Sequence, residues 1–267
     1  MKKIDTILFD LDGTLIDTNE VIIASFKATF KRHFPDLVLS KEKIGTFIGP
    51  TLQQTFGEYT DDINLVNEMI KSYREFYVVI EVGNFEIYPN VKETLIKLDK
   101  LGYNLAIVTS KFKEAAWPSF TFYGLENIIK VFIALDHVDK PKPDKEPVLK
   151  ALAHFPNHKE AIMIGDNQGD ILSGQNAGIY SAGVSWSFKG PDHLKEVNPD
   201  FMLENIEDIF RVIKEIDEEW FDGLYFLQNY NRWYTFIQNL WRRKCLSIFG
   251  YYSRYQRTYP YYSKKTR

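Results

Sequence analysis

Cysteine and long hydrophobic runs are scarce in this chain of 267 residues. Its single cysteine, Cys245, has no partner for an intramolecular disulfide, which suits a reducing compartment. No apolar run reaches the roughly 18 residues typical of a membrane-spanning helix, and the charged start is followed by strand-forming residues rather than by the apolar stretch of a signal peptide. These absences predict a cytoplasmic protein without spanning helices.

Acidic residues are absent from one part of the chain. The formal net charge is −3, but residues 228–267 hold nine Lys or Arg and no acid, which leaves about −12 on the remainder. The slightly negative total gives no reason to expect nucleic acid as the partner of the main part of the protein.

The C-terminal extension, residues 217–267, also holds 16 of the 41 aromatic residues. Basic side chains among Trp and Tyr suit a membrane surface or another anionic partner, and they could also stack on nucleic acid bases. An unselected sequence, such as a shifted reading frame produces, is an equally good interpretation. In either case the extension is expected to be disordered or a loosely attached helix.

Strands and helices alternate along most of the rest of the chain. Short apolar runs predict strands at residues 6–9, 104–108, 131–135, 161–164, 180–184 and 201–203. Helical periodicity lies between them, with an interruption expected near Pro118. Residues 18–84 are helical in pattern, with no convincing strand. We therefore predict an α/β fold, a Rossmann-like doubly wound parallel sheet formed by residues 1–16 and 86–216, with a small all-helical cap domain of residues 17–85 inserted into it.

Two acids stand at the end of the first predicted strand. Asp10 and Asp12 are two positions apart, so their side chains point to the same side. Gly13 allows a sharp turn, and Thr14 adds a hydroxyl. Two neighbouring carboxylates repel each other, and a divalent cation with oxygen ligands, such as Mg²⁺, would relieve the conflict. The alternative is a solvent-exposed turn with incidental acids.

Further polar groups follow other predicted strands, whose carboxyl ends share one edge of a parallel sheet. The complete set is Asp10, Asp12, Thr109, Ser110, Lys142, Asp166 and Asp170. A carboxylate can attack phosphorus, and a second one can exchange a proton with the leaving oxygen and with water. A lysine and a small hydroxyl can hold the phosphoryl oxygens, while further acids complete a magnesium site. The set therefore predicts phosphoryl transfer.

Over roughly residues 1–214, the order of these groups resembles the four motifs of haloacid-dehalogenase-superfamily phosphatases. The resemblance implies that Asp10 is the nucleophile and Asp12 the general acid/base, which also lends its backbone carbonyl to the metal. It implies that Asp166 is a metal ligand and that Asp170 either binds the metal through water or holds Lys142. Dehalogenases and phosphonate hydrolases of the superfamily lack the second aspartate, so Asp12 argues against both activities.

Three assignments remain open within this resemblance. Thr109 is favoured over Ser110 for contact with a phosphate oxygen, and Ser110 for support behind it. Lys142 is favoured over Lys140 because a Lys-Pro-Asp pattern leads into the next helix. Lys111 and Lys113 either attract phosphate or start a solvated helix.

The substrate is the least determined feature. The stretches 4–10, 47–50, 142–148 and 182–186 are similar to PpaX-type inorganic pyrophosphatases, which implies Mg²⁺-dependent hydrolysis of diphosphate to orthophosphate. Phosphoglycolate phosphatases share the same frame, so another small phosphomonoester is the alternative substrate. The stretch 47–50, with Gly49 and Pro50, resembles the cap loop that enters the site in relatives with a small helical cap, and an ordinary helix break is its other interpretation. A binding or regulatory protein that uses the same scaffold without catalysis is the alternative from a different functional class.

Overall fold

The computed structural model describes residues 3–81 and 84–218. The chain divides into two compact units, residues 1–216 and 217–267, and the features below belong to the first. The expectations for the basic, aromatic extension therefore fall outside the described residues, except at its first two positions. Within the described ranges, no helix combines the length and apolar character that crossing a membrane requires.

A six-stranded sheet forms the centre of the first unit, in the order β5-β4-β1-β6-β7-β8. Its strands are β1 (Ile4–Phe9), β4 (Asn104–Val108), β5 (Val131–Ile133), β6 (Glu160–Gly165), β7 (Tyr180–Val184) and β8 (Phe201–Leu203). All neighbouring strands are parallel, which confirms the predicted fold class. Because β1 pairs with both β4 and β6, the strand order reverses beside β1, the point where sheets of this kind hold ligands.

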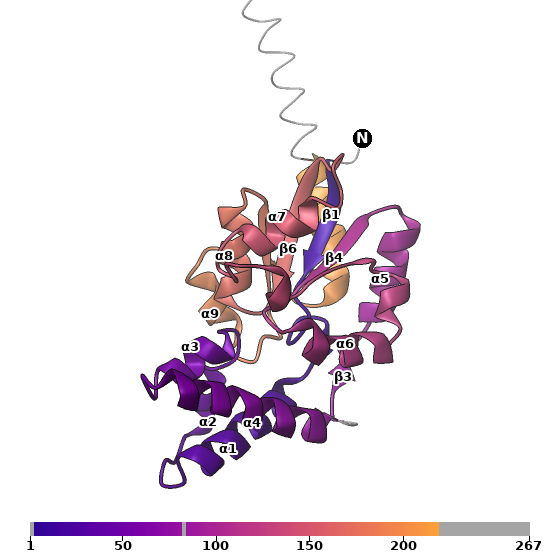
Figure 1. The fold of residues 1–267 in the computed structure, drawn as a ribbon. Helices are drawn as coiled ribbons and strands as arrows, with labels where there is room; N and C mark the ends of the chain where they lie inside the picture. Colours follow the sequence, from indigo (N-terminus) through magenta and orange to yellow (C-terminus); the bar gives the residue numbers. More distant parts are fainter. Residues whose placement is uncertain (1–2, 82–83, 219–267) are drawn as a thin grey trace, which may run out of the picture. The chain divides into compact units, whose positions relative to one another are not determined.

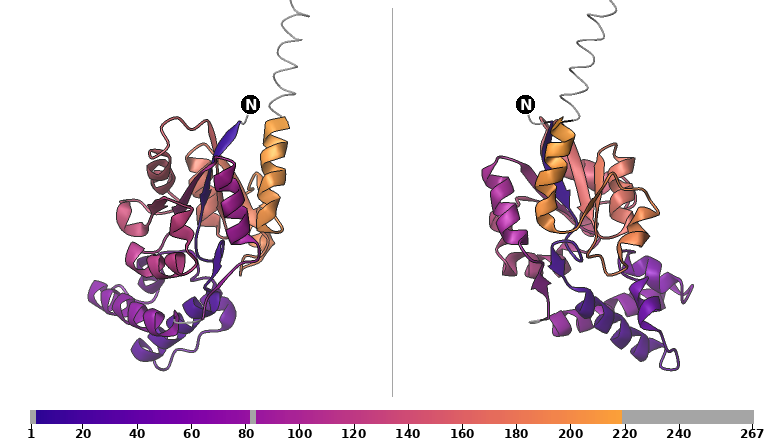
Figure 2. Two further views of the ribbon diagram at one scale, coloured as in Figure 1. Left: turned by 90° about the vertical axis from the view of Figure 1, so that its right-hand side faces the viewer. Right: turned by 180° about the vertical axis from the view of Figure 1, so that it is seen from behind.

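Helices cover both faces of the sheet (Figures 1 and 2). Phe9 of β1 faces the layer of α5 (Val91–Lys100), α6 (Lys113–Phe122) and the helical residues 209–216, orange in Figure 1. Its neighbour Leu8 faces α7 (Glu146–Leu152). Two further helices, α8 (Gln168–Asn176) and α9 (Pro191–Lys195), follow β6 and β7. Burial on both faces explains why the strands are continuous apolar runs in the sequence.

Of the described helices between β1 and β4, all but α5 form a separate layer, which we call the cap: α1 (Asn19–His33), α2 (Lys41–Gly45), α3 (Leu52–Gly57) and α4 (Ile63–Glu81). Figure 1 shows them gathered at one end of the sheet. The cap has its own hydrophobic cluster, in which the ring of Phe26 lies 5.7 Å from that of Phe56 and 4.7 Å from that of Tyr73. The cap therefore has a core distinct from those that flank the sheet.

Three details differ from the sequence-based expectation. Short strands β2 (Ile16–Asp17) and β3 (Glu86–Ile87) pair antiparallel at the two chain crossings between cap and core, and two residues are too few to produce a periodic pattern. The short helix α9 was also not predicted. The interruption expected near Pro118 was wrong, because α6 continues through it. Ring contacts of Trp117 and Phe120 with Phe132 of β5 hold this helix on the sheet despite the missing backbone donor.

Candidate active site

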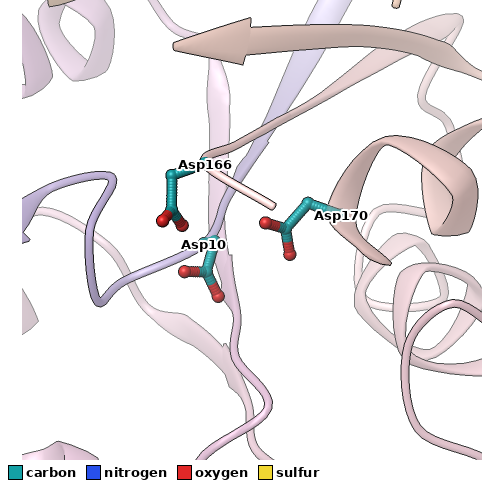
Figure 3. Close-up of side chains that lie close together, drawn as sticks. All are labelled: Asp10, Asp166 and Asp170. Carbon is teal, nitrogen blue, oxygen red and sulfur yellow. The ribbon is translucent and has the colours of Figure 1, made fainter. Parts of the chain in front are cut away.

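The polar groups that follow separate strands meet at the carboxyl edge of the sheet. Asp10 directly follows β1, Thr109 follows β4 and Asp166 follows β6. Lys142 lies in the loop before α7, and Asp170 lies in the first turn of α8. The three buried carboxylates converge, each with an oxygen atom within 4.8 Å of the others (Figure 3). Asp10 and Asp170, which are 160 positions apart in the sequence, thus belong to one cluster.

Lys142 is the cation at the centre of this cluster. Its ammonium donates hydrogen bonds to Asp10 Oδ1 at 2.7 Å, to Asp170 Oδ1 at 2.5 Å and to the Val108 carbonyl at 2.9 Å. Burial alone would lower the pKa of Lys142, but the two carboxylates raise it above its usual value, so this lysine stays charged. The rival Lys140 is exposed and lies outside the cluster.

The carboxylates carry more negative charge than Lys142 can balance. Burial raises the pKa of Asp10 from 3.8 to about 7, with a further rise from Asp170, although Lys142 opposes the shift. Burial, followed by the charges of Asp10 and Asp170, also raises the pKa of Asp166 well above 3.8. When all three carboxylates are ionised, the single ammonium leaves two negative charges unbalanced. These charges and the all-oxygen donor set fit a hard divalent cation such as Mg²⁺.

The backbone around the carboxylates is shaped for this close approach. Gly13 has a φ of +82°, and a Cβ at this position would lie 2.4 Å from Asp166 Oδ2. Only glycine lets the turn after Asp12 come this close to Asp166. Thr14 Oγ1 donates to the other oxygen of Asp166 at 3.4 Å, and Asn167 Nδ2 donates to Oδ2 at 3.0 Å.

Asp12 has partners of its own. Its Oδ1 accepts hydrogen bonds from Thr18 Oγ1 at 2.7 Å and from Lys111 Nζ at 3.0 Å. Thr18 precedes α1, but its side chain makes no capping hydrogen bond. Among the described residues, the carboxylates grouped for a metal are those of Asp10, Asp166 and Asp170. Metal binding by Asp12 through its backbone carbonyl stays a prediction.

The two hydroxyl candidates after β4 differ in environment. Thr109 is buried, its backbone N–H donates to the Ile133 carbonyl at 2.9 Å, and its Oγ1 accepts from the Lys111 N–H at 3.2 Å. Ser110 is half-buried. Both stand at the sheet edge beside Asp10, and their division of labour toward phosphate stays a prediction.

Two lysines, Lys111 and Lys189, connect the site to the cap. Lys111 Nζ donates to Tyr77 Oη of α4 at 2.6 Å as well as to Asp12. Lys189 Nζ donates to the Ile48 carbonyl at 2.6 Å and to Asn167 Oδ1 at 3.1 Å. The sequence offers two roles for Lys111, attraction of phosphate or the start of a solvated helix, and its position just after β4 is the signal that points to the site. No spacing pattern identified Lys189.

The predicted cap loop reaches the core beside Asp166. Gly49 lies so close to Asn167 that a Cβ would come within 2.5 Å of Asn167 Oδ1. Pro50 is exposed. Burial lowers the pKa of Lys189, although the negative charges of Asp166 and Asp170 oppose that shift. The loop therefore packs on the residue that follows Asp166 in the chain.

Comparison with known proteins agrees with this geometry. Residues 7–184 match the family model of haloacid dehalogenase-like hydrolases. A Listeria monocytogenes protein named pyrophosphatase PpaX is 43% identical over 218 residues, which cover 81% of this chain and 99% of that one. A Bacillus cereus protein of the same name is 41% identical over 216 residues, covering 80% and 99%. The solved structure of a predicted phosphoglycolate phosphatase from Haemophilus somnus superposes with a TM-score of 0.70 at 25% identity, covering 79% and 99%.

The likeness to PpaX-type proteins is thus confirmed, and the matched residues 7–184 include the cap and all four motifs. Since the family model covers more than half of the chain, the protein belongs to the haloacid dehalogenase-like hydrolases and is a phosphatase of that family.

Proposed function

We propose that this phosphatase hydrolyses inorganic diphosphate to two orthophosphates in the cytosol, with magnesium and through an aspartyl phosphate. The buried Asp10 carboxylate, 2.7 Å from the Lys142 ammonium and grouped with Asp166 and Asp170, is the observation that carries the proposal. The names of the 41–43% identical relatives support diphosphate as the substrate. The single cysteine supports a reducing compartment.

In the first half-reaction, an Asp10 oxygen attacks one phosphorus atom of diphosphate. The bond from that phosphorus to the bridging oxygen breaks, and its electron pair stays on the bridging oxygen, which takes a proton from Asp12 and leaves as part of orthophosphate. Lys142 and Thr109 hold the oxygens of the transferring phosphoryl group, where negative charge must be stabilised. Asp12 lies at the rim of the cluster, where it can meet the leaving oxygen.

In the second half-reaction, water attacks the phosphorus of the aspartyl phosphate. Asp12, now a carboxylate, takes the proton of that water, and the phosphorus–oxygen bond to Asp10 breaks. The second orthophosphate leaves, and both aspartates return to their starting states. Magnesium, held by Asp10, Asp166 and the Asp12 carbonyl, would neutralise charge on the nucleophile and the phosphate, while Asp170 keeps Lys142 in place.

A phosphoglycolate phosphatase is the second candidate. It rests on the superposition with the Haemophilus somnus structure and on a nucleophile site that is the same for any phosphoryl donor. A non-catalytic protein on this scaffold is less well supported, because a scaffold has no need of three buried carboxylates. For the extension, contact with an anionic surface remains a proposal based on its composition.

The decisive experiment measures phosphate release from diphosphate and from phosphoglycolate side by side, with magnesium and with a chelator. We expect diphosphate to have the higher kcat/KM and both activities to require magnesium. A higher kcat/KM for phosphoglycolate would select the second candidate. Absence of turnover on both substrates and on a panel of phosphomonoesters would support the alternative of a non-catalytic protein built on this fold.

A further inference from the structure

Lys111 is held at the junction between the sheet edge and the cap. Its ammonium lies 3.0 Å from Asp12 Oδ1 and 2.6 Å from Tyr77 Oη, and it stands over the Tyr77 ring at 4.1 Å from the centroid. The side chains of Lys111 and Asp12 are only 16% and 13% exposed. A hydrogen bond, an ion pair and a cation–π contact fix one ammonium in this position.

This position follows from the two elements that supply it. Lys111 comes two residues after Thr109, and its backbone N–H donates to Thr109 Oγ1 at 3.2 Å. This hydrogen bond holds the main chain of Lys111 at the carboxyl edge of the sheet. Tyr77 lies on α4, the longest helix of the cap, and is almost fully buried. Thus core and cap both determine where the ammonium stands.

The ammonium also lies where the leaving group must pass. A general acid transfers its proton across about 2.6–3.2 Å, so the leaving oxygen comes within that distance of Asp12. Lys111 is 3.0 Å from the same carboxylate, which brings atoms bonded to the leaving oxygen within its reach. In diphosphate the atom bonded to the leaving oxygen is a phosphorus whose three other oxygens share up to two negative charges, whereas in a simple phosphomonoester it is an uncharged carbon. Lys142 is engaged on the nucleophile side by Asp10, Asp170 and Val108.

We propose that Lys111 binds the leaving phosphoryl group and sets a preference for anionic leaving groups, with Tyr77 as the residue that positions it. This inference rests on the proposed role of Asp12 as the general acid. Lys111 selects the substrate through the negative charge of the leaving group, whereas Lys142 acts on the phosphoryl group that is transferred to Asp10. The cap takes part in this selection because α4 supplies Tyr77.

The test compares kcat/KM on diphosphate with kcat/KM on phenyl phosphate, whose leaving group carries no second charge. In Lys111→Met we expect the ratio of the two values to fall about 10- to 100-fold, the size of one charge-assisted hydrogen bond. Lys111→Arg should recover part of the loss, and Tyr77→Phe should lower the ratio by a smaller factor. The matched control is Lys113→Met, since Lys113 is exposed and its ammonium lies over the Trp117 ring, and its ratio should stay at the wild-type value.

A merely structural role for Lys111 would lower both activities together and leave the ratio unchanged, and that result would overturn the inference. Thermal unfolding of each variant shows whether it is folded. If Lys111→Met does not fold, the inhibition constant of methylenediphosphonate is measured in Tyr77→Phe and Lys111→Arg instead. We expect this constant to be higher than in the wild type. An unchanged constant would overturn the inference. If the wild type releases nothing from diphosphate, the proposed substrate fails, and the same ratio with phosphoglycolate as the anionic substrate then decides the role of Lys111.

Discussion

The centre and the rim of this site are built differently. At the centre, Lys142 bridges Asp10 and Asp170, all from the core and all almost fully buried. At the rim, Lys111 joins Asp12 to Tyr77, and Lys189 joins Asn167 to Ile48, so each lysine links core and cap. The contacts of the centre involve core residues alone, whereas those of the rim also need residues of the cap. In the proposed mechanism the covalent chemistry belongs to the centre, and the rim controls the access of substrate and water.

The strongest test of the centre removes the nucleophile. Asp10→Asn keeps the shape of the side chain but cannot form an acyl phosphate, so turnover should fall on the order of 10⁴-fold or more. Phosphate release with magnesium measures the loss, and circular dichroism should show an unchanged fold. Full activity in this variant would exclude Asp10 as the nucleophile.

At the rim, Asp12→Ala should have the next largest effect. Removal of a general acid costs about 10²- to 10⁴-fold in turnover, while the phosphate pocket around Lys142 and Thr109 stays in place. Binding of a phosphate mimic such as vanadate, measured by competition, should therefore change little. Loss of vanadate binding together with turnover would place Asp12 in the phosphate pocket. That result would contradict the assignment of phosphate binding to the centre alone.

Lys142→Met tests the centre through stability. It leaves Asp10 and Asp170 buried without their cation, and we expect the free energy of unfolding of the metal-free protein to fall by about 3–5 kcal/mol at pH 8. Urea denaturation measures the change. Lys140→Met is the matched control, because Lys140 is exposed two positions away and should give the wild-type value. Equal losses in the two variants would contradict a special role for the buried ammonium.

Much of the centre, and little of the rim, could be predicted from the sequence. Asp10, Lys142 and Asp166 each follow an apolar run or stand in a short local pattern, and the parallel sheet brings such strand ends together. The contacts of Lys111 and Lys189 depend on how the cap docks, and no local pattern encodes docking. The same reason applies to β2 and β3, whose pairing is a long-range contact of two residues each. The path of α6 through Pro118 shows tertiary packing overriding a local signal.

The unbalanced charge of the centre predicts a pH effect on metal-free stability. Asp10 titrates near 3.8 when unfolded and at about 7 when folded, and the pKa of Asp166 is shifted in the same direction. Groups whose folded pKa is raised contribute their full stability below the unfolded pKa, and that stability is lost as the pH rises through the folded pKa. The metal-free protein should therefore lose on the order of a few kcal/mol between pH 4 and pH 8.

Magnesium should oppose this loss. At 100 times its Kd it adds about 2.7 kcal/mol at pH 8, and less at pH 5, where protonated carboxylates bind it poorly. Thermal unfolding with and without magnesium at both pH values measures the difference. Asp166→Asn should reduce both the pH effect and the magnesium effect. Equal stabilisation by magnesium at pH 5 and pH 8 would contradict a carboxylate metal centre.

The smallest expected effect lies at the contact of the cap loop with the core. Gly49 has a φ of +108°, and a Cβ there would lie 2.5 Å from Asn167 Oδ1, so Gly49→Ala must displace either the loop or Asn167. Asn167 donates to Asp166 and accepts from Lys189, which means that the displacement reaches both the centre and the rim. We expect KM to rise about 3- to 10-fold and stability to fall by about 1–2 kcal/mol.

Gly57→Ala is the matched control for this prediction, since a Cβ at Gly57 at the end of α3 meets nothing within 4 Å. It should leave KM unchanged and keep or slightly raise stability. A change in KM with constant kcat in Gly49→Ala would mean that the loop acts on substrate capture alone, as expected of the rim. A fall in kcat of similar size would mean that loop docking also sets the geometry of Asp166 through Asn167, so the rim would help to assemble the centre.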